Sequence, residues 1–365
     1  MKLSAARDVL LKPLQAVIGV VERRQTMPIL SNVLLVAKNG QLSVTATDLE
    51  VELVAETDVD VESGGEITVS GRKLLDICRA LPESAVVSVS VSGEKLHVRS
   101  GRSKFALATL PAAEFPTVEE IKAAQTITVD QAVMGRLIEK THFSMAQQDV
   151  RYYLNGMLLE TGGKHLRTVA TDGHRLALSQ AELDGAELEE QQVIVPRKGV
   201  LELQRLLSGE GSVDIVLGAN HVRVQLEGIR FTSKLIDGRF PEYDRVIPQD
   251  SSNELSADRE VLKGALQRTA ILSNEKYRGI RLIIRDNGVV LQAHNPEQEE
   301  AEEELEVSYG GEDIEIGFNV NYLLDALGAV ESDEVALSVV DSNSSCLIRE
   351  PGNDDCKFVV MPMRL

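Results

Sequence analysis

The sequence contains little that would support a disulfide framework, a metal centre or a membrane anchor. Only three of the 365 residues are cysteine, at Cys78, Cys346 and Cys356, and no two of them form a Cys-x-x-Cys pair. An odd number of unpaired cysteines is typical of proteins in the reducing cytoplasm. No apolar run approaches the roughly 18 to 20 residues that span a bilayer, and the first residues lack the apolar segment of a signal peptide. We therefore expect a cytoplasmic protein without a membrane partner, a metal or a cofactor.

The chain is also poor in aromatic side chains and in positive charge. Aromatics make up 4% of the residues and tryptophan is absent, so the 43% of apolar residues must form aliphatic cores. The net charge of −19 at first argues against a nucleic-acid partner, because phosphate binding normally needs a basic surface. Binding depends on where the basic residues lie, however, and here they cluster as Arg23-Arg24, Arg72-Lys73 and Arg197-Lys198.

What the sequence does contain is a threefold repeat. Ala46-Thr47-Asp48 recurs as Ala170-Thr171-Asp172 and, more weakly, as Ala293-His294-Asn295, at intervals of about 120 residues. Phe105, Phe231 and Phe358 open the last apolar run of each repeat. Solenoid repeats are about 20–50 residues long, whereas about 120 residues form an independent domain. We predict three similar domains, at residues 1–120, 125–247 and 253–365.

Each repeat has the pattern helix, strands, helix, strands. Helical spacing of apolar residues predicts first helices over 5–20, 130–145 and 258–272, and second helices over 72–80, 197–207 and 319–329. Pro13 should kink the first helix or mark a start near residue 12. Alternating strands and hairpin signals such as Asn39-Gly40 and Gly162-Gly163 surround the helices. The fold class is therefore α+β, with two helices packed on antiparallel sheets in each domain.

Catalytic motifs are scarce. Thr171-Asp172-Gly173-His174-Arg175 could be an acid–base site of a hydrolase, or a turn in which Asp172 binds the backbone. The turn is favoured because Asp48 takes the equivalent place without a histidine. The acidic run from Glu297 to Glu306 could bind a divalent cation, but it lacks the spacing of a calcium loop and fits a solvated or subunit-facing edge better. We do not expect an enzyme.

Several longer segments resemble the beta subunit of bacterial DNA polymerase III, the sliding-clamp family. The resemblance is carried in chain order by residues 150–157 (VRYYLNGM), 168–176 (TVATDGHRL), 195–199 (VPRKG), 271–276 (ILSNEK), 295–300 and 359–365 (VVMPMRL). It implies a head-to-tail homodimer that closes a ring of six domains around duplex DNA and tethers the replicative polymerase. The implied partners are a clamp loader, the polymerase alpha subunit, and other polymerases and repair proteins that carry clamp-binding peptides.

Simple geometry agrees with two chains rather than one. A compact domain of about 120 residues is roughly 35 Å across. Three such spheres in a closed ring leave a gap of about 5 Å, whereas six leave roughly 35 Å, which is wide enough for a duplex of about 20 Å. A ring held by topology needs little affinity, which makes the acidic total compatible with DNA.

The resemblance also implies three sets of site residues. The positions that match those facing DNA are Arg24, Gln148, Tyr152, Tyr153, Arg197 and Lys198. One of the two tyrosines could instead be packed partly in the core. The positions that match a groove for a peptide rich in Gln, Leu and Phe are Leu154, Thr171, Gly173, His174, Arg175, Leu176, Pro241, Arg245, Val246, Tyr322, Ser345, Met361, Pro362, Met363 and Arg364. The tail at residues 361–365 (MPMRL) could also form a final edge strand.

The third set is the implied subunit interface between the first domain of one chain and the third of the other. Its apolar centre would be Phe105, Leu107, Ile271 and Leu272, with Lys73, Arg102 and Lys104 facing Glu297, Glu300 and Glu303. A competing interpretation keeps the repeats but makes the chain a scaffold of three protein-binding domains with no role on DNA. Charge reversal at Arg24, Arg197 and Lys198 separates the two, because only a clamp should lose its loading on DNA.

Overall fold

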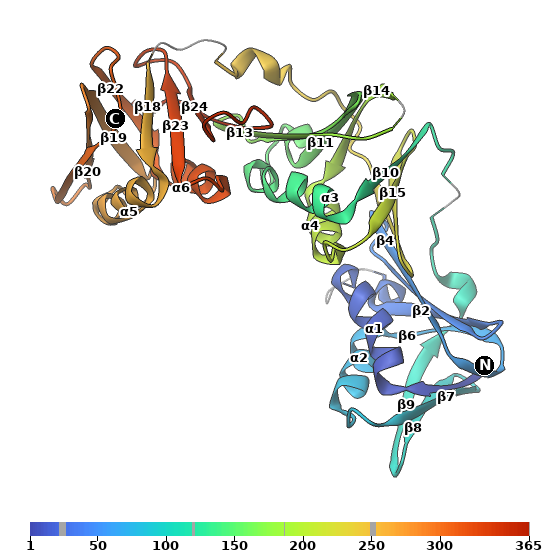
Figure 1. The fold of residues 1–365 in the computed structure, drawn as a ribbon. Helices are drawn as coiled ribbons and strands as arrows, with labels where there is room; N and C mark the ends of the chain where they lie inside the picture. The colour runs from blue at the N-terminus through green and yellow to red at the C-terminus, as the bar shows by residue number, and fades with distance from the viewer. Residues whose placement is uncertain (22–26, 119–120, 186, 249–252, 365) are drawn as a thin grey trace. The chain divides into compact units, whose positions relative to one another are not determined.

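The computed structural model describes residues 1–21, 27–118, 121–185, 187–248 and 253–364 (Figure 1). The chain divides into two compact units, one of residues 1–134 and 198–235, the other of residues 135–197 and 236–365. The middle repeat contributes to both units. The predicted seams near residues 116–124 and 248–253 fall in stretches where the described residues form neither helix nor strand.

The first unit contains one continuous antiparallel sheet of 13 strands, in the order β10-β15-β16-β17-β4-β3-β2-β6-β9-β8-β7-β1-β5. Its strands are β1 (Lys2–Ala6), β2 (Asn32–Lys38), β3 (Gln41–Thr47), β4 (Val51–Asp58), β5 (Asp60–Ser63), β6 (Gly65–Ser70), β7 (Val86–Ser92), β8 (Lys95–Ser100), β9 (Ser103–Leu110), β10 (Gln125–Asp130), β15 (Ser212–Leu217), β16 (His221–Leu226) and β17 (Ile229–Lys234). The first and second repeats are joined where β17 pairs with β4, with Phe231 opposite Leu53. The helices are α1 (Arg7–Val17), α2 (Gly71–Ala80) and, from Lys198 on, α4 (Arg197–Leu206); α1 and α2 lie side by side (Figure 1).

The second unit contains two antiparallel sheets, in the orders β14-β11-β12-β13-β25-β24-β23-β18 and β21-β20-β19-β22. The strands are β11 (Gly156–Gly163), β12 (His165–Thr171), β13 (Arg175–Glu182), β14 (Leu188–Pro196), β18 (Glu254–Asp258), β19 (Gly279–Arg285), β20 (Gly288–His294), β21 (Glu300–Glu306), β22 (Ile314–Asn319), β23 (Glu334–Val339), β24 (Cys346–Arg349) and β25 (Cys356–Val360). Pairing of β13 with β25 joins the second repeat to the third, as β17 and β4 join the first two. The helices are α5 (Arg259–Thr269), α6 (Val320–Ala329) and most of α3 (Gln131–Glu139).

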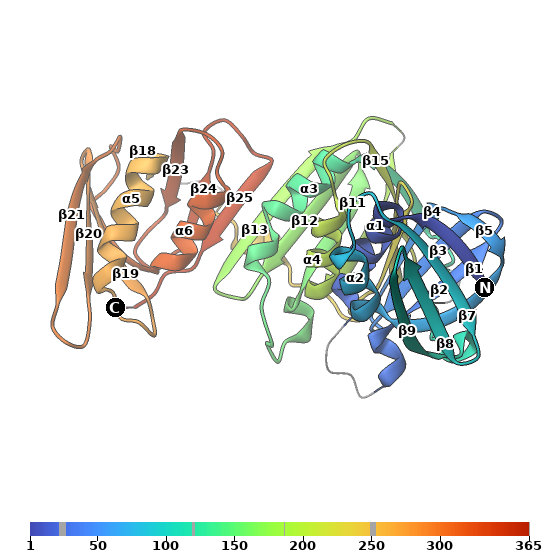
Figure 2. The same cartoon turned by 90° about the horizontal axis from the view of Figure 1, so that it is seen from below.

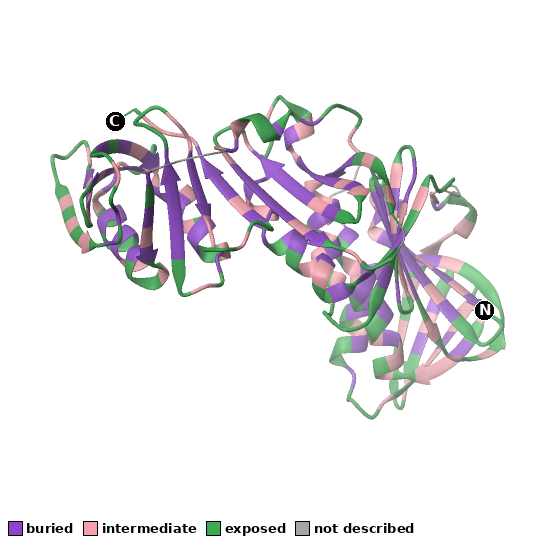
Figure 3. Cartoon of the chain, turned by 45° about the horizontal axis from the view of Figure 1, so that its top comes forward, coloured by how far each residue is buried: buried purple, intermediate pink, exposed green. Residues whose placement is uncertain are grey.

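The core of the third repeat lies between its two sheets. Helices α5 and α6 lie side by side there (Figure 2) and bury Leu262, Leu266, Leu323 and Leu327 against strand residues such as Phe318. In Figure 3 the buried residues run along strands and one side of each helix, while exposed residues gather at turns. These positions follow the periods of 2 and 3.6 that the sequence predicts, so the predicted class of helices on antiparallel sheets is confirmed.

The first helix of each repeat is shorter than predicted. Helices α1, α3 and α5 end at Val17, Glu139 and Thr269, and each is followed by a short 3₁₀ turn: η1 (Ile18–Val20), η4 (His142–Ser144) and η7 (Ala270–Leu272). A tightened last turn of this kind is common at helix ends and keeps the apolar period that led to the longer prediction. The predictions for the second helices, by contrast, agree with α2, α4 and α6 to within one residue at each end.

Pro13 does not mark the start of α1. The helix begins at Arg7, whose backbone N–H donates to the Ala85 carbonyl (2.8 Å) and whose Nε donates to the Cys78 carbonyl (2.9 Å). These contacts fix the first turn before Pro13, which is buried within the helix and removes one intrahelical hydrogen bond. The alternative start near residue 12 is therefore wrong.

The hairpin predictions are confirmed. Asn39 and Gly40 between β2 and β3 have φ of 53° and 78°, and Gly163 between β11 and β12 has φ of 58°. Positive φ at both central residues matches the right-handed twist of the flanking strands, which explains Asn-Gly at this turn. Among the described residues, no helix is long and apolar enough to cross a membrane.

Candidate functional site

The repeated Thr-Asp motif forms a turn in both the first and the second repeat. The Asp172 Oδ1 atom accepts the backbone N–H groups of His174 (2.9 Å) and Arg175 (3.0 Å), and Thr171 donates its hydroxyl to the Arg175 carbonyl (2.6 Å). The first repeat forms the same bonds around Asp48, whose Oδ1 accepts from Glu50 (2.9 Å) and Val51 (2.7 Å). Asp172 thus holds backbone groups, as the turn interpretation requires, and its geometry gives no support to acid–base chemistry with His174.

We predict that Asp172→Ala lowers the free energy of unfolding by about 1–3 kcal/mol, because two backbone donors lose their acceptor. Asp48→Ala should cost a similar amount. Urea unfolding measures both, with Asp76→Ala, an exposed carboxylate on α2, as the control. Equal unfolding midpoints for Asp172→Ala and Asp76→Ala would contradict this role of the turn.

Arg175 lies at the centre of a network that links β13 to α6. Its Nε donates to Asp172 Oδ2 (3.1 Å), its Nη1 to Asp325 (2.5 Å) and its Nη2 to the Phe143 carbonyl (2.7 Å). The guanidinium also stacks over the Tyr322 ring at 4.6 Å, and burial raises the pKa of that phenol. Three of the predicted groove residues are therefore connected through Arg175: Tyr322 lies against its guanidinium, and Thr171 binds its backbone carbonyl. Asp325 and Phe143 are members of this network that the sequence did not indicate.

The C-terminal residues extend this surface without forming a strand. Strand β25 ends at Val360, and the Met361 N–H donates to the His174 carbonyl (2.9 Å). The Met363 N–H donates to the Gly317 carbonyl (2.7 Å). The predicted final edge strand is wrong for residues 361–364, because their backbone bonds go to a turn and to β22; moreover β25 is an interior strand. Met361, Pro362 and Met363 are half-buried and Arg364 is exposed.

The remaining predicted groove residues lie on the sheet and on the segment that crosses it. Leu176 is buried in an apolar cluster with Leu347 and Val359, and Val246 packs partly against this cluster. Ser345 donates its hydroxyl to the Val246 carbonyl (3.2 Å). Gly173, His174, Pro241 and Arg245 are exposed. Leu154 is buried and binds the loop before it, where its carbonyl accepts the Ala146 N–H (3.0 Å).

That loop, residues 147–155, carries three of the predicted DNA-facing residues. Asn155 holds it together by exchanging two 2.9 Å hydrogen bonds with the Asp149 backbone. Hydrogen bonds from Arg151 lower the pKa of Asp149 to about 2. Gln148 is exposed with φ of 58°. Val150, which was not among the predicted DNA-facing residues, is 95% exposed on the same loop. Its position between Gln148 and Tyr152 is the only sequence signal that points to it as part of this exposed surface.

The two tyrosines of the loop, in η5 (Tyr152–Leu154), have different surroundings. Tyr152 is exposed, whereas Tyr153 packs partly against the apolar cluster under the crossing segment. Their rings meet edge to face at 5.8 Å between centroids. Partial core packing therefore applies to Tyr153, and Tyr152 is the freer of the two.

The predicted basic residues are not equally available. Arg24 lies outside the described residues. Arg197 is half-buried, with its Nη1 3.4 Å from the Met145 carbonyl. The ammonium group of Lys198 forms an ion pair with Asp48, whose side chain is nearly buried in the first-repeat turn. The repeated aspartate thus has a second contact in the first repeat that the sequence pattern did not show.

The basic half of the predicted subunit interface lies along β9. β9 pairs with β8 from Ser103 to Ala108, but it meets β6 only at Thr109 and Leu110. In the described residues the other edge of β9 is unpaired over 103–108. Lys73, Arg102 and Lys104 are exposed, and Phe105 and Leu107 are half-buried. Unpaired strand edges are templates for pairing with another chain.

The acidic half lies along β21, which is the end strand of its four-stranded sheet. Glu297 and Glu300 are exposed, while Glu303 accepts two hydrogen bonds from Arg268 of the same chain (2.6 and 2.7 Å), which lower the pKa of Glu303. Ile271 in η7 is 74% exposed and Leu272 half-buried.

No group of three or more His, Cys, Asp or Glu side chains in the described part of the chain is arranged to hold a metal ion.

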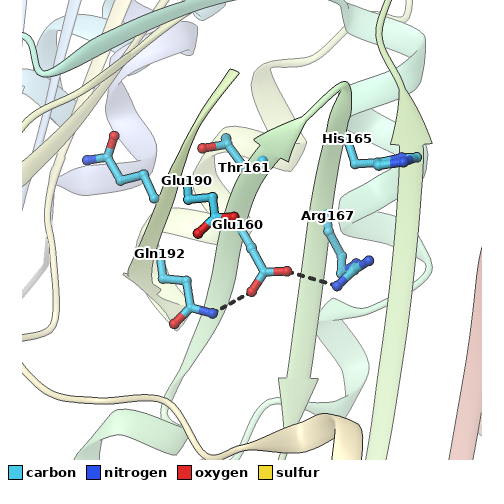
Figure 4. Close-up of a pocket in the computed structure, with 8 residues that line it drawn as sticks. Glu160, Thr161, His165, Arg167, Glu190 and Gln192 are labelled. Carbon is cyan, nitrogen blue, oxygen red and sulfur yellow. Dashed lines mark hydrogen bonds and ion pairs between the residues drawn. The ribbon is translucent and has the colours of Figure 1, made fainter. Parts of the chain in front are cut away.

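A hollow of about 570 Å³ lies over β11, β12 and β14 (Figure 4), and none of its lining residues belongs to the three predicted sets. Glu160 stands in its floor, where Oε1 accepts from Arg167 (2.9 Å) and Oε2 from Gln192 (2.5 Å). Thr161, His165 and Glu190 complete the labelled lining.

Comparison with known families decides what the repeats are. Family models of the DNA polymerase III beta subunit match the N-terminal domain at residues 1–119, the central domain at 128–242 and the C-terminal domain at 244–364. The chain belongs to the DNA polymerase III beta subunit family. The beta sliding clamps of Pseudomonas putida and Escherichia coli are 56% and 52% identical to it over 367 aligned residues, with 100% of both chains covered.

Solved beta subunits have the same fold. The DNA polymerase III subunit beta of Pseudomonas aeruginosa matches with a TM-score of 0.98 at 55% identity, and that of Caulobacter crescentus with 0.95 at 41%, each covering 100% of both chains. The family and the three-domain clamp fold predicted from the sequence are confirmed. This beta subunit is a DNA sliding clamp that serves processive synthesis by DNA polymerase III, and members of the family are processivity factors rather than catalytic subunits.

Proposed function

We propose that two copies of this chain close head to tail into a ring that encircles duplex DNA. The observation that carries the proposal is the pair of complementary strand edges. β9 offers an unpaired edge flanked by Arg102 and Lys104, and β21 offers an end strand rich in glutamate. Unlike charges favour pairing of one edge with the other and disfavour pairing of either edge with itself. Each chain carries one edge of each kind, so two chains can form two identical joints.

DNA would pass through this ring beside the basic residues and the 147–155 loop. Six side chains, Arg24, Gln148, Tyr152, Tyr153, Arg197 and Lys198, are proposed to face it. Few of them are cations, and the chain as a whole has a net charge of −19. A small number of phosphate contacts suits a protein that must slide, because every strong contact slows movement along the duplex. The pairing of Lys198 with Asp48 further limits the phosphate affinity.

Partner proteins would dock where the second and third repeats share a sheet. We propose that a peptide rich in Gln, Leu and Phe binds over Leu176, Val246 and the Met361-Pro362-Met363 tail, beside the Arg175 network. Flexible methionines can repack around different ligands. The clamp loader, the polymerase alpha subunit, and other polymerases and repair proteins would then compete for one surface. We propose that the protein acts in the cytoplasm, where its three cysteines, all free and buried, would remain reduced.

A protein that encircles DNA should be retained on a closed circle but not on DNA with free ends. Loaded on a nicked circle by a clamp loader from a bacterial relative with ATP, the protein should remain bound through gel filtration at high salt. Cutting the circle should release at least nine-tenths of it, because the ring can then slide off an end. Equal retention on the circle and on the cut form would mean ordinary binding and would contradict the ring.

A further inference from the structure

Residues 236–247, which follow β17, cross one face of the eight-stranded sheet. Phe240, Tyr243 and Ile247 of this segment are buried among Leu158, Val169, Leu176, Leu178, Ile194, Leu347 and Val359. Between them, Pro241, Glu242, Asp244 and Arg245 are exposed and Val246 is half-buried. One side of the segment is thus inserted in the sheet's apolar cluster, and the other side presents residues proposed to contact partner peptides.

Tyr243, which begins η6 (Tyr243–Val246), is tied to the sheet by its hydroxyl. This group donates to Glu160 Oε1 (2.9 Å) and accepts from Arg167 Nη1 (2.8 Å). The side chain is 4% exposed and burial raises the pKa of the phenol. Arg167 is itself held by two bonds to Gln180 Oε1 (3.2 and 2.9 Å), and Glu160 by Gln192 (Figure 4). The hydroxyl therefore lies in a hydrogen-bonded network that spans four neighbouring strands, β14, β11, β12 and β13.

Few other polar contacts fix this stretch. The Ile236 N–H donates to the Ile194 carbonyl (2.9 Å) at its start, and Ser345 binds the Val246 carbonyl (3.2 Å) near its end. Between them, over the described residues 237–245, the hydrogen bonds to the sheet are those of the Tyr243 hydroxyl, and the Asp244 carboxylate adds a charge interaction with Arg167. Apolar packing holds the segment down but is non-directional, whereas a bond to a charge pair fixes position along the sheet.

We propose that Glu160, Arg167 and Tyr243 are positioning residues for partner docking: they lock η6 in the place that lets Pro241, Arg245 and Val246 form one side of the peptide site. This inference rests on the proposed peptide surface and deepens it. It assigns to a polar network beside the Figure 4 hollow a role in affinity for partners, although none of the three side chains touches the peptide.

The test is Tyr243→Phe, which keeps the buried ring and removes only the hydroxyl. Binding of a fluorescein-labelled Gln-Leu-Ala-Leu-Phe peptide, measured by fluorescence anisotropy, should weaken about five- to tenfold, the size expected for the loss of one hydrogen bond of about 1–1.4 kcal/mol. Hydrogen exchange of residues 238–247 should become faster. Tyr309→Phe is the matched control, because Tyr309 is 3% exposed and donates its hydroxyl to the Glu312 carbonyl (2.6 Å) in another part of the same unit.

Equal peptide affinity in Tyr243→Phe, Tyr309→Phe and the unaltered protein would overturn the positioning role. Arg167→Met tests the same network from the sheet side and should weaken peptide binding to a similar degree. In the double variant Tyr243→Phe, Arg167→Met the loss of affinity should be smaller than the product of the two single losses, since the residues act as one unit. Fully multiplicative losses would also contradict the proposal. Failure of the unaltered protein to bind the peptide would instead refute the proposed peptide surface, and so separates the two ideas.

Discussion

Replacing Ile271 and Leu272 by alanine is expected to convert the protein in solution from two chains to one. Ile271 is 74% exposed in η7, which packs beside β21, so the proposed joint would cover it. Each substitution removes about three carbons, worth about 2.4 kcal/mol if they are buried in the joint. Two residues at two joints then lose about 5–10 kcal/mol, or roughly four to seven orders of magnitude in the dissociation constant. Native mass measurement should give a value near the chain mass of 39.9 kDa.

Val261→Ala is the matched control for this variant. Val261 is 54% exposed on α5, the helix that leads into η7, and belongs to no predicted interface. It should leave the mass of the dimer unchanged. An unaltered dimer mass in the Ile271→Ala, Leu272→Ala variant would refute the assignment of these residues to the joint. A dimer of the unaltered protein that tightens on addition of salt would contradict the proposed pairing of basic β9 with acidic β21, because salt screens such charges.

Arg197→Glu is expected to reduce loading on DNA at least tenfold. The guanidinium lies at the start of α4 with one weak bond to the Met145 carbonyl, so most of its donors remain for phosphate. Reversal replaces an attraction by a repulsion at a site where few cations are present, and the salt dependence of binding should fall by about one counterion. Lys198→Gln should have a smaller effect, since Asp48 already offsets the charge of Lys198. Retention on nicked circular DNA measures both.

Lys164→Glu is the control for charge alone. Lys164 is exposed in the hairpin between β11 and β12. The substitution Lys164→Glu changes the net charge of the chain by the same amount as Arg197→Glu. The competing interpretation, a scaffold with no role on DNA, predicts that Arg197→Glu and Lys164→Glu behave alike. Partner-peptide binding should be unchanged in both variants, which shows that the loss is specific to DNA.

The repeat predicted the architecture well because each part of it has a local cause. The Thr-Asp turn depends on side chains that bind backbone groups two to four residues away, and the Asn39-Gly40 hairpin depends on positive φ. Such causes are readable from neighbouring residues. The continuity of sheets from one repeat to the next was not readable, because pairing of β17 with β4 joins residues far apart in sequence. The boundaries at 120–125 and 247–253 remain predictions.

The site was predictable in its members but not in its connections. Arg175, Tyr322 and Met361 were named from the family resemblance, yet nothing in the sequence indicated that Asp325 and the Phe143 carbonyl would bind the Arg175 guanidinium. Glu303 was expected to face another subunit, and the structure adds an ion pair with Arg268 of its own chain. Contacts of this kind depend on how distant elements pack, and composition and spacing carry no information about them.

The alternation of side chains along β9 has a consequence for how accurately the proposed ring can close. Phe105 and Leu107 are half-buried while Lys104 and Ala106 are exposed, so a slip of one residue against a partner strand would exchange the apolar and charged faces. A joint made by such an edge would have one permitted register, and the angle between neighbouring domains would be fixed with it. Because the two proposed joints would be identical, a fixed angle would decide whether two chains end as a closed circle or continue as an open fibre.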